Sequence, residues 1–176
     1  MANVAISGDT SGAVTLTVPS TVGTQTATFP AATGTVMVSG NMPAFSATQT
    51  SAGTTINHDA WTKITFDTKI FDTNNNFASS RFTPTVAGYY QLNGQTLFST
   101  VSTQNCSIAF YKNGSIFQTG SSGATTTSAY LQISGLIYLN GSTDYVELYA
   151  YFSGTGSQTT AFPVNTNFNG SMVRSA

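Results

Sequence analysis

Few residues in this sequence could perform catalysis. Its 176 residues include one histidine, His58, and one cysteine, Cys106. Nucleophilic catalysis needs a nucleophile near a base that a carboxylate orients. Asp59 follows His58, but no Gly-x-Ser-x-Gly elbow is present, and one histidine with one cysteine is too few for a zinc site. We therefore expect a protein that is not an enzyme and that uses no cofactor.

The acidic residues form no motif of paired catalytic carboxylates such as a glycoside hydrolase uses: Asp9, Asp59, Asp67, Asp72, Asp144 and Glu147. Asp67 and Asp72 flank a short segment that is followed by Asn74, Asn75 and Asn76. Their side-chain oxygens are of the type that calcium prefers. Turn formation is the commoner role of Asp and Asn in such a segment, so we predict no metal site and keep calcium as an open alternative.

The segment 145–152 predicts a strand with two different faces. Apolar residues alternate with tyrosines and one glutamate: Val146, Leu148, Ala150 and Phe152 face the core, and Tyr145, Glu147, Tyr149 and Tyr151 face outward. Tyrosine joins a large apolar ring to a polar tip and is favoured at interfaces. A row of tyrosines on an outward face therefore indicates either a contact with another subunit or loop, or a surface that binds a ligand.

A glycan is the ligand that suits an outer surface of Tyr, Asn, Ser and Thr, because sugars bind through hydrogen bonds and ring stacking. The candidate ligand-binding residues are Tyr145, Tyr149 and Tyr151 on this strand and Asn74, Asn75 and Asn76 in the loop after Asp72.

The composition favours a protein that assembles with other subunits. Only 6% of the residues are charged, whereas globular chains carry about a quarter, and uncharged polar residues supply the surface instead. Such a surface is poorly protected against self-association. The net charge is −1 and the basic residues are scattered, which argues against nucleic-acid binding.

The sequence predicts neither membrane insertion nor secretion. No apolar stretch approaches the roughly 20 residues that a membrane helix requires. Residues 1–9 lack the basic and apolar regions of a signal peptide. We expect assembly into a particle in the cytoplasm where the chain is made.

Residues 1–42 predict a separate N-terminal arm. Short alternating segments such as 4–6 and 13–19 are separated by Gly, Pro and Ser turns. Their few, small apolar residues cannot bury enough surface to offset the entropy of ordering the chain. The arm is expected to be ordered by other copies or by another protein, and a flexible tail is the alternative.

Residues 43–176 predict an all-β domain. Strand signals recur at the spacing of a β-sandwich, at residues 44–48, 61–66, 82, 89–102, 107–112, 115–119, 127–139, 145–152 and 168–174. Asn113-Gly114 is the strongest hairpin signal. Cys106 lies in a predicted strand as a small buried residue, and no segment has a sustained helical period.

The segment 81–92 organises this domain. Pro84 belongs in a loop, Gly88 permits a backbone conformation that other residues resist, and a long strand follows. Phe82, Gly88 and Tyr90, at this spacing, resemble the central signature of the complement C1q and tumour necrosis factor superfamily. Phe168 and Gly170 resemble the aromatic-x-Gly of its closing strand. Further segments match in order, at residues 43–47, 64–67, 137–141 and 144–148.

The resemblance covers about residues 43–176. It implies an antiparallel jelly-roll sandwich that forms a homotrimer, binds through loops and outer faces, and is not an enzyme. The arm looks like segments of bacteriophage fibre and structural proteins, and the segment 81–92 looks like phage versions of the domain. The resemblance therefore favours a virion protein, a trimeric tail-fibre or receptor-binding knob that contacts a host glycan or protein.

A head fibre or capsid decoration protein is the alternative function. Residues 1–42 would then attach the trimer to the shell instead of the tail. The chain is short for a tail fibre and has no evident shaft, which keeps this alternative open.

Overall fold

The computed structural model describes residues 4–7, 13–16, 36–98, 104–125, 128–154, 156–160 and 165–176. It divides the chain into two compact units, Met1–Gly34 and Thr35–Ala176. The boundary predicted after residue 42 lies slightly later in the chain than this division. In the first unit, β1 (Val4–Ser7) pairs antiparallel with β2 (Ala13–Leu16).

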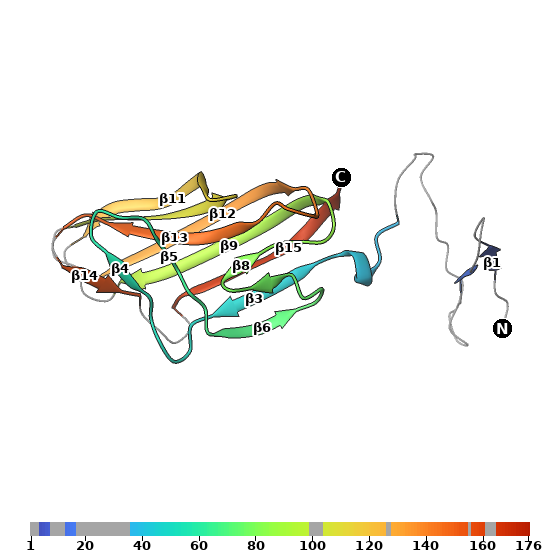
Figure 1. Cartoon of the computed structure of the whole chain (residues 1–176), viewed down its shortest axis with the longest axis horizontal. Helices are drawn as coiled ribbons and strands as arrows, with labels where there is room; N and C mark the ends of the chain where they lie inside the picture. Colours follow the sequence, from blue (N-terminus) through green and yellow to red (C-terminus); the bar gives the residue numbers. More distant parts are fainter. Residues whose placement is uncertain are drawn as a thin grey trace, which may run out of the picture. The chain divides into compact units, whose positions relative to one another are not determined.

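The second unit is built from two antiparallel sheets (Figure 1). One sheet has the order β11-β10-β13-β8-β7, with β5 beside β13. Its strands are β5 (Thr62–Lys63), β7 (Phe77–Ala78), β8 (Arg81–Phe82), β10 (Gln104–Lys112), β11 (Ser115–Thr125) and β13 (Val146–Phe152). The other sheet has the order β12-β9-β15-β3-β6. Its strands are β3 (Ala44–Thr48), β6 (Thr68–Asp72), β9 (Gly88–Phe98), β12 (Ala129–Leu139) and β15 (Asn167–Ser175).

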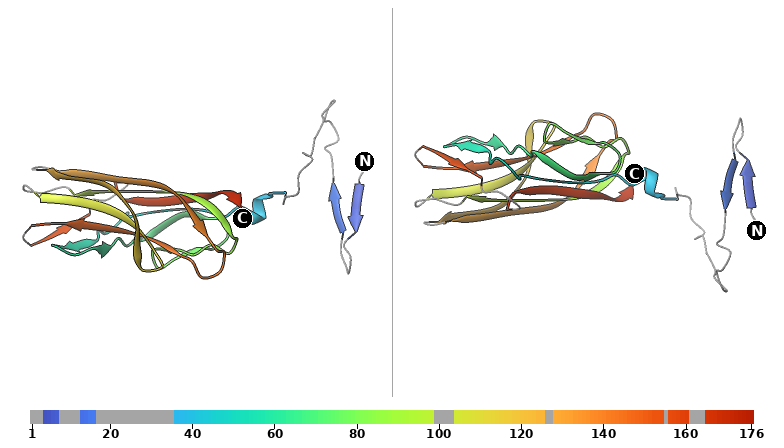
Figure 2. Two further views of the ribbon diagram at one scale, coloured as in Figure 1. Left: turned by 90° about the horizontal axis from the view of Figure 1, so that it is seen from above. Right: turned by 90° about the horizontal axis from the view of Figure 1, so that it is seen from below.

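Smaller elements complete the unit. The strands β4 (Thr55–Asn57) and β14 (Ser157–Thr159) pair with each other, and η1 (Ser39–Asn41) precedes β3. The two ends of the unit lie together (Figure 2), and the Met172 amide donates to the Pro43 carbonyl at 2.9 Å. Within the described ranges, no helix is long and apolar enough to cross a membrane.

The core between the sheets is rich in phenylalanine. Phe45 lies at its centre, stacked on Phe82 with ring centroids 4.3 Å apart and on Phe77 at 4.9 Å. Phe168 meets Phe45 edge to face at 4.9 Å. Tyr90 is fully buried, and burial raises the pKa of its hydroxyl. The signature aromatics therefore build the core, as the resemblance implied.

Most long predicted strands are confirmed, with shifted ends. The strand Ala44–Thr48 has the predicted bounds, and Asn113 with Gly114 has the positive φ values, 53° and 82°, of a tight hairpin turn. The predicted strand 61–66 shrinks to Thr62–Lys63. The short strands β4, β6, β7 and β14 were not predicted, because strands of two to five residues show too little alternation. Residues 99–102 and 127, assigned to strands from the sequence, lie outside the described residues.

The glycine at the start of β9 has a different role from the expected one. The φ of Gly88 lies outside the left-handed region, so the structure does not use the conformational freedom that glycine permits at this position. A Cβ at this position would lie 2.4 Å from the Arg174 carbonyl oxygen and 2.8 Å from Met172 Cε. Glycine is needed here because β15 lies too close for any side chain.

Gly88→Ala is expected to lower the free energy of unfolding by about 1–3 kcal/mol, because the backbone of β15 must move to admit the methyl group. Gly123→Ala is the matched control in β11, where a Cβ would have no neighbour within 4 Å. Its effect should stay within about 0.5 kcal/mol. Urea unfolding measures both, and equal stabilities of the two variants would contradict this role of Gly88.

Side chains also close the seam between the two sheets. β12 is an edge strand, and its carbonyls would otherwise lack strand partners. Gln118 Nε2 donates to the Ser134 carbonyl at 2.9 Å, and Ser121 Oγ donates to the Gln132 carbonyl at 3.0 Å. The edge of β12 is therefore bonded to β11 of the other sheet, which leaves the outer faces of the two sheets as the broad free surfaces.

Candidate binding face

The predicted tyrosine row lies on the outer face of the six-stranded sheet. Inward residues of β13 are fully buried, including Val146 and Leu148, which confirms the predicted division of the two faces. Tyr149 and Tyr151 point outward from β13 and are partly buried, and Tyr145 directly precedes it. β10 flanks β13 on one side, and β5 and β8 flank it on the other.

Two further aromatic residues join this row. Tyr111 of β10 stacks on Tyr149, with ring centroids 3.8 Å apart and an interplanar angle of 19°. Trp61 directly precedes β5. Its ring centroid lies 5.5 Å from that of Tyr151 and 6.1 Å from that of Tyr111. We call Trp61, Tyr111, Tyr145, Tyr149 and Tyr151 the tyrosine face. The sequence alternation of β10 could have shown that Tyr111 points outward, but no signal connected Trp61 with β13.

A buried ion cluster lies at the centre of this face. Glu147 is only 3% exposed, although its position in the alternation predicted an outward side chain. Its Oε1 accepts hydrogen bonds from Lys63 Nζ at 2.7 Å and from Arg81 Nε at 2.9 Å. Burial alone would raise the pKa of Glu147, but these hydrogen bonds and positive charges outweigh it and hold the pKa below its usual value. The carboxylate is therefore charged and fixes both cations.

The cluster also orders the aromatic rings. The Arg81 guanidinium carbon lies 3.8 Å from the centroid of the Tyr145 ring, a cation–π contact. The Tyr149 hydroxyl lies 3.5 Å from Glu147 Oε2. The arginine is thus held from one side by a carboxylate and from another by a ring, which fixes its orientation.

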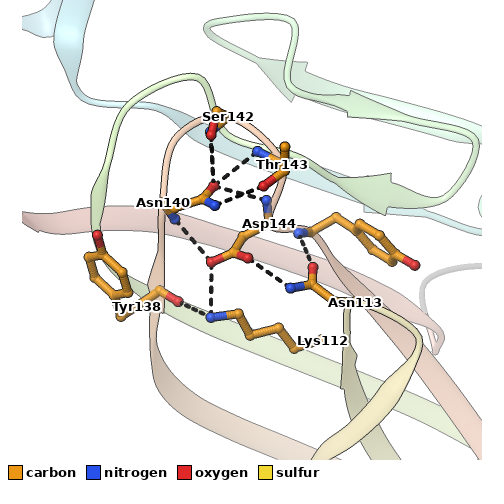
Figure 3. Close-up of polar contacts among 8 residues, drawn as sticks. Lys112, Asn113, Tyr138, Asn140, Ser142, Thr143 and Asp144 are labelled. Carbon is orange, nitrogen blue, oxygen red and sulfur yellow. Dashed lines mark hydrogen bonds and ion pairs between the residues drawn. The ribbon is translucent and has the colours of Figure 1, made fainter.

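A turn network holds the backbone of Tyr145 in place (Figure 3). Asn140 Oδ1 accepts from the amides of Ser142 and Thr143, both at 3.0 Å, and of Asp144 at 2.9 Å. Asn113 Oδ1 accepts from the Tyr145 amide at 3.0 Å. These bonds connect the β10–β11 hairpin to the turn before β13, so that the backbone of Tyr145 has a fixed position.

The carboxylate of Asp144 completes the network. It accepts a hydrogen bond from Asn113 Nδ2 at 2.7 Å and pairs with Lys112 Nζ at 3.0 Å. The hydrogen bond from Asn113, followed by the bond and charge of Lys112, lowers the pKa of Asp144 despite partial burial. Lys112 is thereby neutralised at this end of the sheet.

The asparagine loop is separate from the tyrosine face. Asn76 is 5% exposed. Its Oδ1 accepts a hydrogen bond from the Thr85 backbone amide at 3.3 Å, and its Nδ2 donates to the Asn74 carbonyl at 3.1 Å. Asn74 Nδ2 donates to the Gly40 carbonyl at 2.9 Å. Asn75 is exposed, with a left-handed φ of 54°. Two of the three side-chain amides, those of Asn74 and Asn76, thus hold the loop together. Ligand binding by Asn74, Asn75 and Asn76 stays a prediction.

The carboxylates considered for calcium hold loops in this structure. Asp72 accepts from the amides of Asn76 at 2.8 Å and Phe77 at 3.0 Å. Asp67 accepts from the amides of Thr50 and Ser51, both at 2.9 Å. Among the described residues, no group of three or more His, Cys, Asp or Glu side chains is placed to hold a metal ion.

Asp67→Asn is expected to lower the melting temperature at pH 7. Hydrogen bonds from the Ser51 side chain and backbone and from Thr50 hold the pKa of Asp67 well below its usual value. The stabilisation is therefore full above the usual Asp pKa of about 4 and is lost progressively as the pH falls from there towards the lowered pKa. Calorimetry should show the full difference from wild type at pH 7 and pH 6 and a steadily smaller one below about pH 4. A difference that does not change with pH would contradict this role of the charge.

His58 and Asp59, considered for catalysis from the sequence, contact each other at one end of the tyrosine face. His58 Nδ1 lies 3.2 Å from Asp59 Oδ2 on the exposed surface. The Tyr151 hydroxyl donates to Asp59 Oδ1 at 3.2 Å, so Asp59 holds one edge of the tyrosine face. Cys106 is buried and unpaired, and burial raises the pKa of its thiol, which makes it a core residue, as predicted.

Solved structures of known proteins share this fold. The globular domain of the zebrafish complement 1qA protein is 17% identical with a TM-score of 0.58, and the match covers 76% of this chain and 99% of that chain. Murine APRIL at pH 5.0 is 12% identical with a TM-score of 0.56, covering 75% and 99%. Eiger TNF from S. frugiperda is 10% identical with a TM-score of 0.50, covering 77% and 93%. No family model and no curated protein sequence matches the chain.

These similarities define the class of fold. The second unit is an antiparallel jelly roll of the C1q and tumour necrosis factor type, as the signature residues implied. At such low identities the similarity shows the fold alone. What the protein binds has to be argued from its own surfaces.

Proposed function

We propose that the chain is a virion structural protein of a bacteriophage, a homotrimeric tail-fibre or receptor-binding knob that attaches the particle to its host. The tyrosine face carries this proposal. It combines five aromatic side chains with an ordered arginine on an outer sheet face, in a chain with few other charges. Aromatic and arginine side chains are the residue types most enriched among binding hot spots. We infer a binding role rather than catalysis.

The outer face of the five-stranded sheet suits contact with identical subunits. Large apolar side chains are exposed at its β9 and β12 edge, among them Tyr89 at 40%, Leu136 at 56% and Tyr138 at 43%. Its centre is a hollow lined by amides, with Asn93 Nδ2 bonded to Asn169 Oδ1 at 3.2 Å. The proposed trimer buries this face, which leaves the tyrosine face on the opposite sheet free.

The N-terminal unit is the proposed attachment point to other virion proteins. The sequence of residues 1–42 looks like phage fibre segments, and its few apolar residues favour packing against a partner. The same unit bound to the capsid shell would make the protein a head fibre or decoration protein, which is the second candidate.

A competition assay tests the receptor-binding function. The purified chain should be a trimer by sedimentation equilibrium and should slow the adsorption of the phage that encodes it to host cells in a dose-dependent way, because it occupies the receptor. A trimer that leaves adsorption unchanged would contradict the receptor-binding role. A monomer would contradict the proposed trimeric assembly.

A further inference from the structure

The guanidinium of Arg81 presents its two terminal nitrogens as hydrogen-bond donors at the tyrosine face. Its Nε is bonded to Glu147 and its plane is held over the Tyr145 ring. No hydrogen bond or ion pair to another described residue occupies the two terminal nitrogens, and the side chain is 42% exposed. An arginine held in this way presents a planar pair of donors, the geometry that matches a carboxylate or phosphate group.

The charges around this arginine leave a positive excess. Lys63 and Arg81 share one carboxylate, Glu147, so the cluster carries one net positive charge. At one end of the face Lys112 is neutralised by Asp144, and at the other end Asp59 faces Tyr151 beside His58. The positive excess is therefore confined to the centre of the face, next to the rings.

One oxygen of the buried Glu147 carboxylate accepts only one long hydrogen bond. Both cations bond Oε1 of Glu147, and Oε2 has only the Tyr149 hydroxyl at 3.5 Å. A buried carboxylate oxygen normally accepts shorter hydrogen bonds, and a ligand hydroxyl would supply one. Tyr145 and Tyr149 flank this position on the same side of β13, each about 7 Å away along the strand, which is the scale of one sugar ring.

We propose that the tyrosine face binds an acidic saccharide, whose negative group is held by the terminal nitrogens of Arg81 and whose ring lies against the neighbouring tyrosines. A hydroxyl of the sugar donates to Glu147 Oε2, and Lys63 positions that carboxylate. The negative group is a carboxylate, as in uronic or sialic acids, or the phosphate of a phosphate-linked glycan. This inference rests on the proposed receptor-binding function and specifies its ligand class.

A glycan array distinguishes between a carboxylate and a phosphate as the negative group of the ligand. It carries oligogalacturonates, sialosides and glycerol-phosphate glycans, each beside a neutral glycan of the same length. The wild-type trimer should bind at least one acidic class at least tenfold more strongly than its neutral counterpart, and less strongly at high salt. The class that binds identifies the source of the negative group.

Arg81→Gln should reduce acidic binding at least tenfold, to the level of the neutral glycans. Arg81→Lys keeps the charge beside Glu147 but loses the planar pair of donors, so it should fold as wild type and bind with intermediate strength. Lys69→Gln is the matched control, since it removes an exposed positive charge that pairs with Asp72 away from this face. It should bind as wild type.

The possible failures are distinguishable. Equal binding of acidic and neutral glycans, unchanged in Arg81→Gln, would overturn the acidic ligand and leave the receptor-binding function standing. Blocked phage adsorption without binding to any glycan would overturn the saccharide class alone. Absence of both effects would overturn the receptor-binding function as well.

Discussion

The triple variant Tyr145→Ala, Tyr149→Ala and Tyr151→Ala is expected to lose at least about 100-fold in its ability to block phage adsorption. Each truncation at a binding hot spot costs about 2 kcal/mol or more, and 1.4 kcal/mol corresponds to tenfold in affinity. The changes lie on the outer face, whereas the neighbouring inward residues of β13 are fully buried. The variant should therefore still fold and form trimers, as sedimentation and circular dichroism would show.

Phe117→Ala is the matched control for this experiment. Phe117 is 49% exposed on β11, the edge strand of the six-stranded sheet, and lies outside both the tyrosine face and the proposed trimer face. The variant therefore also loses a surface ring but keeps the tyrosine face. It should block adsorption as well as wild type. If the triple variant formed trimers and blocked adsorption fully, the tyrosine face would not be the receptor site.

Phe45→Ala is expected to lower the free energy of unfolding by about 3–5 kcal/mol, the range for truncation of a buried phenylalanine. The Phe45 ring is fully buried and contacts Phe77, Phe82 and Phe168, so its removal leaves a cavity that three large rings cannot easily fill. Because these rings come from both sheets, the loss should weaken the whole sandwich. Urea unfolding with a single transition would measure it.

Phe71→Ala provides the control for the core variant. Phe71 lies on β6, the neighbour of the strand that carries Phe45, and is 48% exposed. Its truncation creates no internal cavity and should change stability by no more than about 0.5 kcal/mol. A loss as large as that of Phe45→Ala would show that the core is not centred where the structure places it.

Long, regular elements could be predicted from the sequence because their alternation is strong. In β13 seven residues divide into a buried and an outward set, and the hairpin at Asn113-Gly114 has a turn signature of its own. The short strands carry no such signal. Strands like β5 and β8 exist because they pair with the longer β13, which is information that lies elsewhere in the chain.

The binding face could be predicted only in part. Alternation placed Tyr149 and Tyr151 outward, but it could not bring Trp61 and Arg81 beside them, since those contacts depend on sheet order. It also assigned Glu147 to the outward face, but it could not show that two cations from neighbouring strands cover this side chain. Pairing across strands, rather than local pattern, determines which side chains meet on a sheet.

Gly88 shows the same limit for a signature residue. The sequence indicated that glycine was required at the start of β9, but the expected reason was backbone conformation. The structure gives close contact with β15 as the reason. A close approach between distant strands leaves no trace in the local sequence.

Gold labelling of intact phage particles with an antibody against the chain tests the central claim most directly. We expect label at the distal ends of the tail fibres, where a receptor-binding knob meets the host. Label distributed over the head would contradict that function and favour a head fibre or decoration protein. Particles without label, from a preparation in which the antibody recognises the purified trimer, would contradict a place in the virion.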